Sequence, residues 1–187
     1  MRFFEMIYIM RHGKTDWNKM EKLQGSVDIP LNEEGLSVAR KAREKYKKIT
    51  FDICYSSPLI RAKKTAELFL EGTDTPIVVD ERLKEMSFGE YEGTCGYFNN
   101  PECPINNLFV DPVNYVSVGG AESFEHLSER TLSFLNEIAY PMHEEGKSIL
   151  IVCHGALGCS IISHVKNTPL ANFWDNLMGN CELVKLL

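Results

Sequence analysis

Two arginines and two histidines follow predicted strands in a pattern that suits phosphoryl transfer. Arg11 with His12, Arg61 and His154 each come after an apolar, β-prone stretch. Guanidinium groups hold phosphate oxygens with a rigid fork of N–H donors, and their charge favours the neutral form of a nearby imidazole. A neutral imidazole can attack phosphorus and form a covalent phosphohistidine. These four residues therefore predict a site for a phosphoryl group.

Such a reaction also needs a proton for the leaving alkoxide and then a base for the attacking water. A single carboxyl group can serve both steps. Glu85, beyond a third predicted strand, is placed for this role, and Glu90 and Glu92 lie close enough in the sequence to compete with it. The positive surroundings would repel a divalent cation, and no carboxylate lies beside either histidine, so a metal site is disfavoured.

The sequence Gly13-Lys14-Thr15 raises a second interpretation, because a nucleotide-binding P-loop ends in the same three residues. That motif places a glycine five residues before its Gly-Lys-Thr, so that the backbone can wrap the phosphates. The corresponding position is Tyr8, inside a predicted strand. The P-loop interpretation therefore fails.

The elements that must position these residues alternate between strands and helices. The apolar stretches predict strands at 4–10, 51–56, 76–79, 148–153 and 181–187. Helices are predicted after Asn32 (35–48), from Pro58 (58–70), at 122–144 and at 155–165, whereas 93–121 is irregular. The continuous, β-branched stretch 148–153 is typical of the centre of a parallel sheet.

Alternating strands and helices indicate an α/β fold, a mainly parallel sheet covered by helices on both faces. Ligands of such sheets bind beyond the carboxyl ends of the strands, where all the candidate residues can meet. Each residue alone is more often a surface charge or a core histidine, and only their convergence favours a site. His126, His143 and His164 lie in predicted helices, where solvated or capping roles are expected.

Composition excludes several functional classes. The net charge of −6 gives no basic field for nucleic acid or for an anionic membrane, and no apolar stretch approaches the length of a membrane span. Residues 1–5 do not begin a signal peptide. Six cysteines without a CxxC pair are expected to be free thiols. We therefore expect a cytoplasmic protein.

The motifs resemble those of one known family. Arg11 to Thr15 with Trp17-Asn18 are similar to the RHGxTxxN signature of the histidine phosphatase superfamily, in its phosphoglycerate mutase-like branch. The similarity continues in order through QGSVDIPLNEEG, SSPLIRAKKTAE, RLKEMSFGEYEG, GGAESFEHLSER and VCHGALG, and so covers essentially the whole chain. It implies a three-layer α/β/α fold in one domain over 1–187, with a substrate-covering insertion at about 86–121. It also implies that no metal or organic cofactor is needed.

The resemblance also implies roles for matching positions. His12 would be the nucleophile that becomes phosphorylated, and Glu85 the proton donor. The phosphoryl oxygens would be held by Arg11, Arg61 and His154. Further positions match residues that line the phosphate pocket or lie near the substrate, and they are Asn18, Gln24 and Gly25.

The expected activity is hydrolysis of small-molecule phosphate monoesters. From Glu85 to Glu129 the chain has no lysine or arginine, but eight acidic residues and seven aromatic ones. A substrate with a second acidic group would need a cation from this segment, which covers the leaving group. We therefore expect a neutral, apolar or aromatic leaving group. The competing interpretation is that the aromatic residues form core and the acidic residues a solvated face.

Two other functional classes stay open. A phosphoglycerate mutase-type enzyme would move the phosphoryl group between positions of one substrate, with slow loss to water. A non-catalytic module would only bind phosphorylated ligands, but it would have no need of a nucleophile and a proton donor together. The sequence does not indicate an oligomeric state.

Overall fold

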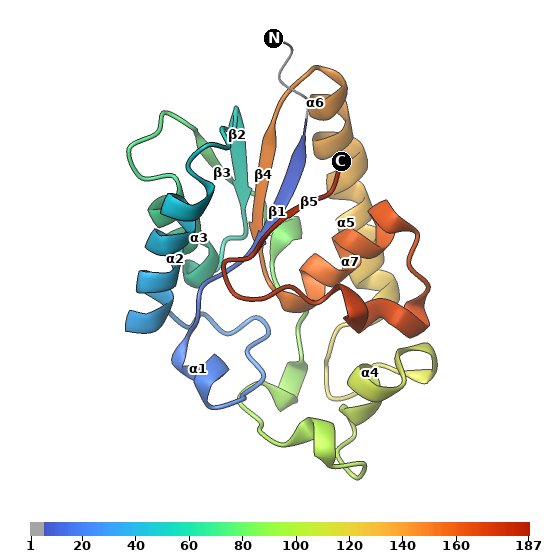
Figure 1. Ribbon diagram of the computed structural model, residues 1–187. Coiled ribbons are helices and arrows are strands. Elements are labelled where there is room, and N and C mark those ends of the chain that lie inside the picture. Colours follow the sequence, from blue (N-terminus) through green and yellow to red (C-terminus); the bar gives the residue numbers. More distant parts are fainter. Residues whose placement is uncertain (1–5) are drawn as a thin grey trace.

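The computed structural model describes residues 6–187, which fold around a five-stranded sheet. The strand order is β3-β2-β4-β1-β5. The parallel strands are β1 (Ile7–Arg11), β2 (Ile53–Ser56), β3 (Ile77–Val79) and β4 (Ile149–Cys153), and β5 (Leu183–Lys185) pairs antiparallel with β1 (Figure 1). The expectation of a mainly parallel sheet is confirmed.

Helices cover both faces of this sheet (Figure 1). On one face α2 (Glu33–Tyr46) and α3 (Ile60–Phe69) pack on one apolar core. On the other face lie α5 (Phe124–Phe134), α6 (Tyr140–Glu144) and α7 (Gly155–Lys166), around a second and larger core. Alternate residues of the central strands contribute to the two cores, because successive side chains of a strand point to opposite faces. The result is the expected three-layer arrangement.

The central strand β4 sets the position of the chemistry. All five of its residues are buried, as its continuous apolar sequence predicts for a strand covered on both faces. Arg11 is in register with Cys153, and the His12 N–H donates to the Cys153 carbonyl at 2.9 Å. The residue after each strand is a histidine, so the register brings His12 and His154 together.

The helix predicted from Pro58 begins two residues later, at Ile60. The side chain of Leu59 at its N-cap has no polar atom to satisfy the first turn. Instead Asp28, from a distant loop, accepts a hydrogen bond from the Ile60 N–H at 2.7 Å. The start of α3 is therefore decided by a tertiary contact, which local sequence does not reveal.

The helix predicted at 122–144 is three consecutive segments. Ser123 caps α5 by accepting from the His126 N–H, and a π-helical turn, η5 (Leu135–Ala139), joins α5 to α6. Pro141 lies in the first turn of α6. A proline there has no N–H to give to the preceding turn, which explains why regular hydrogen bonding is interrupted at this point.

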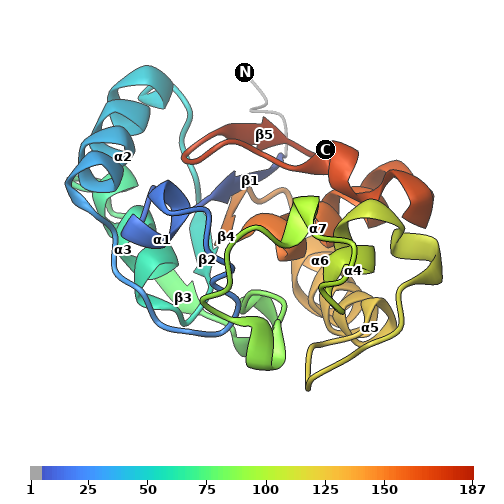
Figure 2. The same cartoon turned by 90° about the horizontal axis from the view of Figure 1, so that it is seen from below.

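Several short helices lie near the carboxyl ends of the parallel strands, which Figure 2 views from below. Segment 93–121, predicted as irregular, holds three of them: η3 (Tyr97–Asn99), α4 (Asn106–Val110) and η4 (Pro112–Asn114). The others are α1 (Asp16–Lys19), η1 (Glu81–Leu83), η2 (Gly89–Tyr91) and η6 (Leu170–Asn176). Most are too short to leave a helical period in the sequence.

The other predicted elements are confirmed to within two residues at the ends that the structure describes, except that the first strand begins at Ile7. Residues 4 and 5 of that prediction, and the segment 1–5 considered as a leader, lie outside the described residues. Within residues 6–187, no helix combines the length and the apolar character that crossing a membrane requires.

Candidate active site

A cavity of about 630 Å³ opens at the carboxyl ends of the parallel strands. It is lined by seven of the eight predicted site residues, namely Arg11, His12, Asn18, Gln24, Gly25, Arg61 and Glu85. The eighth, His154, is completely buried behind them. Residues that are far apart in the sequence thus meet at the sheet edge where the strand pattern places them.

His12 is held as a neutral imidazole with one free nitrogen. Its Nδ1 lies 2.6 Å from the Gly13 carbonyl oxygen, and since a carbonyl can only accept, Nδ1 carries the proton and Nε2 keeps its lone pair. Burial, with the positive charges of Arg61 and Arg11, holds the pKa of His12 well below its ordinary value. The nucleophilic form is therefore the one present at neutral pH.

Arg61 is fully buried and anchored at three points. Its Nη1 and Nη2 donate to the carbonyls of Val27 and Gly25, each at 2.7 Å, and its Nε donates to His154 Nδ1 at 3.2 Å. A guanidinium group has five N–H donors, so two remain for a ligand. Burial lowers the pKa of Arg61 to about 10, and the group is still charged at neutral pH.

Arg11 is the second cation of the site. Its Nη1 donates to the Met178 carbonyl at 3.0 Å. Its Nε is buried and has no hydrogen-bond partner among residues 6–187. Buried donors are normally paired, so an unpaired one beside a cavity points to an anionic ligand.

His154 is paired at both ring nitrogens. With Nδ1 accepting from Arg61, Nε2 carries the proton and donates to the Ser57 hydroxyl at 2.7 Å. The centres of the His154 and His12 rings are 5.1 Å apart. Burial and the charge of Arg61 hold the pKa of His154 well below its ordinary value. Sequence reasoning missed Ser57, although it lies in the block SSPLIR that carries Arg61.

The Glu85 carboxylate is held by four backbone N–H groups. Oε1 accepts from Met86 and Leu157, and Oε2 accepts from Gly155 and Ala156, at 2.9–3.2 Å. Three of these donors are the free N–H groups of the first turn of α7. Glu85 is thus fixed at the edge of the cavity, whereas its competitors Glu90 and Glu92 do not line it. Of the three, only Glu85 is a lining residue of the cavity.

Asn18 and Gln24 share one hydroxyl. Thr15 Oγ1 lies 3.1 Å from Asn18 Oδ1 and 3.0 Å from Gln24 Oε1. These contacts hold both amide side chains beside the cavity that they line. The role of Thr15 is not evident from the sequence.

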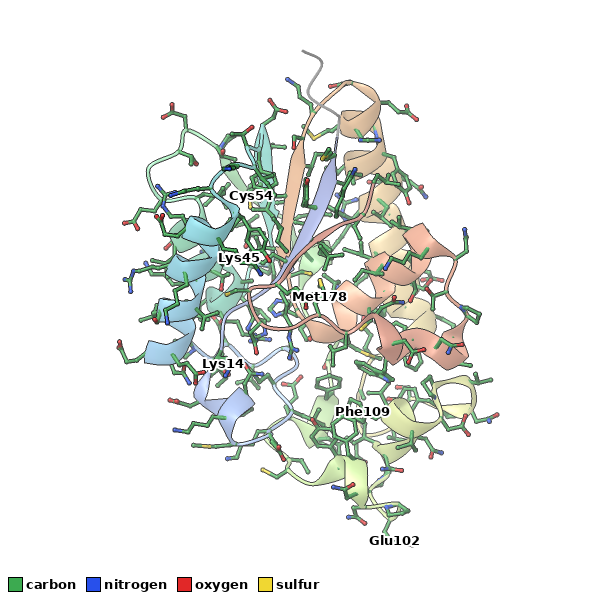
Figure 3. The ribbon with its side chains drawn as sticks, viewed as in Figure 1. Lys14, Lys45, Cys54, Glu102, Phe109 and Met178 are labelled. Atoms are coloured by element: carbon green, nitrogen blue, oxygen red, sulfur yellow. The ribbon has the colours of Figure 1, made fainter. Side chains whose placement is uncertain are left out.

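The far end of the cavity is aromatic. It is lined by Phe88, Tyr97, Phe98, Phe109 and Trp174. Phe109 lies below the lower ends of the strands (Figure 3), and its ring stacks on Trp174 with centres 5.2 Å apart. Trp174, from η6, was not predicted, because it lies far along the chain from the other aromatic residues.

One further cation lines the cavity. Lys22 belongs to the loop after α1, outside the segment in which a cation was sought. Its Nζ lies 5.6 Å from the centre of the Trp17 ring. Despite the absence of lysine and arginine from 85–129, the cavity therefore has a cation besides Arg11 and Arg61.

The remaining histidines and the cysteines lie apart from this chemistry. His126 is exposed and pairs with Glu122 at 2.6 Å, and His164 pairs with Ser128 at 3.2 Å. All six cysteines are free. Cys153, next to His154, is buried, and this burial raises the pKa of its thiol, so it is held in its unreactive form.

Comparison with known proteins identifies the family of this chain. Residues 7–187 match the family model of the histidine phosphatase superfamily (branch 1). A relative from Hydrogenobacter thermophilus, named "Putative phosphoserine phosphatase 2", is 33% identical over 96% of this chain and 88% of its own length. One from Proteus mirabilis, named "Probable phosphoglycerate mutase GpmB", is 31% identical over 96% and 83%.

The fold is shared with solved structures of phosphatases. A mycobacterial glucosyl-3-phosphoglycerate phosphatase, solved as a complex with VO3, superposes with a TM-score of 0.83 at 28% identity, over 96% of this chain and 90% of that one. The chain belongs to the histidine phosphatase superfamily and has its phosphoglycerate mutase-like α/β fold. It is an enzyme of the phosphatase type.

Proposed function

We propose that the protein is a metal-independent phosphomonoesterase that works through a phosphohistidine at His12. The observation that carries this proposal is the free Nε2 lone pair of a buried, neutral imidazole beside two guanidinium groups. A phosphoryl group is the electrophile that both features suit. Segment 86–121 would be the part of a single domain that covers the substrate, since four of its aromatic side chains line the cavity.

In the first step, His12 Nε2 attacks phosphorus and the bond to the ester oxygen breaks. Glu85 begins the cycle as the protonated carboxyl group, and the departing oxygen takes this proton. In the second step, water gives a proton back to Glu85 and attacks phosphorus, and the N–P bond breaks to release inorganic phosphate and neutral His12. One carboxyl group thus ends each cycle in the state in which it began.

The charge that develops on the phosphoryl oxygens would be stabilised by N–H donors held ready. Arg11 Nε and the two unused donors of Arg61 are available without rearrangement. His154 would join them by exchanging its Ser57 partner for a phosphoryl oxygen. Donors fixed before the reaction cost little reorganisation during it, which is why such groups are worth several kcal/mol in transition states.

The leaving group would be aromatic or apolar. Five aromatic side chains line the cavity, and stacking on such rings favours a flat apolar partner. Lys22 could pair with a single acidic group on that leaving group. A mutase-type reaction would need firm binding of a second phosphate or a carboxylate. One lysine by itself would bind such a group only weakly.

The proposal is tested by phosphate release from phenyl phosphate with excess chelator, for the wild type and for His12→Ala. We expect turnover that survives the chelator and falls by about 10⁴-fold or more in the variant, because the nucleophile is gone. Rapid acid-free quenching with labelled substrate should trap label on the wild type alone. Turnover that requires a metal, or that persists in His12→Ala, would refute the mechanism.

A further inference from the structure

Glu92 joins its own loop, which carries Glu85 and Phe88, to the loop of Gly25 and Ser26, and both loops contribute residues to the cavity. Its Oε1 accepts from the N–H and the hydroxyl of Ser26, at 2.8 and 2.9 Å, and from the N–H of Phe88 at 3.1 Å. The hydroxyl of Ser87 lies farther off, at 3.4 Å. A carboxylate that accepts from charge-free donors on two separate loops holds both of them in fixed relation.

One of these loops carries the support for Arg61. Ser26 follows Gly25, whose carbonyl accepts from Arg61 Nη2. Gly25 has a positive φ of 54°, and a Cβ at this position would lie 2.1 Å from Glu92 Oε1. Only glycine therefore lets the carboxylate reach Ser26. The placement of Arg61 thus depends, through two residues, on Glu92.

The other loop carries Glu85. Phe88 is three residues beyond it, and the carboxylate of Glu85 itself is fixed at the first turn of α7. The two loops are also joined by backbone hydrogen bonds, from Gly93 N–H to the Leu23 carbonyl at 2.7 Å and from Leu23 N–H to the Thr94 carbonyl at 3.1 Å. Those bonds lie beyond Glu92, so the carboxylate is the link nearest to the chemistry.

We propose that Glu92 is a positioning residue that sets the separation between the group that holds the phosphoryl oxygens, Arg61, and the group that moves the proton, Glu85. This role rests on the proposed phosphatase function. A leaving group must be protonated while its phosphoryl group is still held, so the two side chains have to be in place at the same moment. Loss of Glu92 should harm those reactions most that depend on the proton.

Two substrates of nearly the same shape separate this role from general support of the fold. The leaving group of phenyl phosphate needs a proton, whereas that of 4-nitrophenyl phosphate departs readily as the anion. The quantity to compare is kcat/KM, because it reports the steps up to departure of the leaving group. A structural defect that only reduces the amount of active enzyme would lower both values by one factor.

For Glu92→Ala we expect kcat/KM to fall about 100-fold with phenyl phosphate and about 10-fold with 4-nitrophenyl phosphate, the sizes typical of misplaced reacting groups and of lost acid catalysis. Glu92→Gln keeps an oxygen that can accept from Ser26 and Phe88, so its kcat/KM should be within a few-fold of the wild-type value for both substrates. Gly25→Ala, which displaces the carboxylate, should reproduce the unequal losses. Glu90→Ala, exposed on the same loop, is the matched control.

Equal losses with both substrates, in an active and folded Glu92→Ala protein, would overturn the role of Glu92 and leave the phosphatase function standing. Unchanged kinetics would overturn it as well. If Glu92→Ala fails to fold by circular dichroism, the comparison is made with Gly25→Ala and Glu92→Gln. A wild type inactive on both substrates would instead refute the proposed function, and the positioning role with it.

Discussion

The two ends of the cavity are built in different ways. At the phosphoryl end the side chains are held by backbone atoms: Arg61 by two carbonyls, Glu85 by four N–H groups and His12 by one carbonyl. At the aromatic end the rings mainly hold each other. Phe109 packs against Phe98 and Tyr97 with ring centres 4.7–4.8 Å apart.

This difference separates what the reaction requires from what the substrate requires. A hydrogen bond to backbone fixes a side chain in direction and distance, and the backbone here belongs to the sheet and its first loops. Ring contacts are worth about 0.5–1.5 kcal/mol each and tolerate several arrangements. The phosphoryl end should therefore resist substitution, whereas the aromatic end can change with the leaving group.

The largest effect is expected at Arg61, at the phosphoryl end. Arg61→Ala should reduce kcat by about 10²–10³-fold for every ester, since a transition-state donor is lost whatever the leaving group. Arg61→Lys keeps the charge without the fork and should recover only part of the loss. The exposed Arg40→Ala on α2 is the control. A loss confined to one class of ester would show that the two ends are not separate in function.

A second test uses the buried histidines, which lie only at the phosphoryl end. The pKa values of His12 and His154 are held well below 6.5 in the folded protein, so below pH 6.5 the unfolded chain binds more protons. The free energy of unfolding should be highest above pH 6.5 and fall as the pH is lowered, by at most about 1.4 kcal/mol per pH unit for each histidine. Urea denaturation at pH 7, 6 and 5 measures this slope. His12→Asn should reduce it, and an equal slope in the variant would contradict the prediction.

At the aromatic end, Phe109→Ala should act on one class of substrate only. Removing a ring that stacks on Trp174 should lower kcat/KM for phenyl phosphate about 10-fold, the cost of losing part of a buried aromatic contact. For an alkyl phosphate such as glycerol phosphate, kcat/KM should change less than about twofold, because it has no ring to stack. Val110→Ala, on the exposed side of α4, is the matched control. Equal losses with both esters would mean that the rings support the fold rather than the substrate.

The smallest effect is expected at Lys22. Lys22→Met should raise KM about 2–5-fold for esters whose leaving group carries a carboxylate, because one partly exposed charge pair is lost. KM for phenyl phosphate should not change. Comparing KM for phosphoserine and phenyl phosphate in the two proteins decides this. A large loss with phosphoserine would move the substrate preference from apolar to acidic leaving groups.

The phosphoryl end was largely predictable from the sequence, because strand ends in a parallel sheet must meet at one edge. His12 and Arg61 could be placed from that rule alone. What the rule could not supply is which partners the side chains find. His154 is predicted to help hold the phosphoryl oxygens, and both of its ring nitrogens are paired within the protein, so it would have to exchange a partner to do so.

The aromatic end was predictable only in composition. The segment of short helices has no period from which to place Phe109, and Trp174 joins it from a distant part of the chain. Lys22 was missed because its position depends on an unusual backbone: the preceding residue, Glu21, has a φ of 53°. Such a conformation in a residue with a side chain is set by its surroundings rather than by local preference.

The segment just before β5, from Met178 to Cys181, holds the end of β1. Asn180 donates to the His12 carbonyl, Cys181 N–H to the Arg11 carbonyl, and the Met178 carbonyl accepts from Arg11, so the end of β1 is held by residues about 170 positions later. At a synthesis rate of about 5–20 residues per second, that delay is roughly 10–30 seconds. His12 therefore leaves the ribosome long before these partners are made, and a nascent chain that stops short of residue 178 should carry His12 without them.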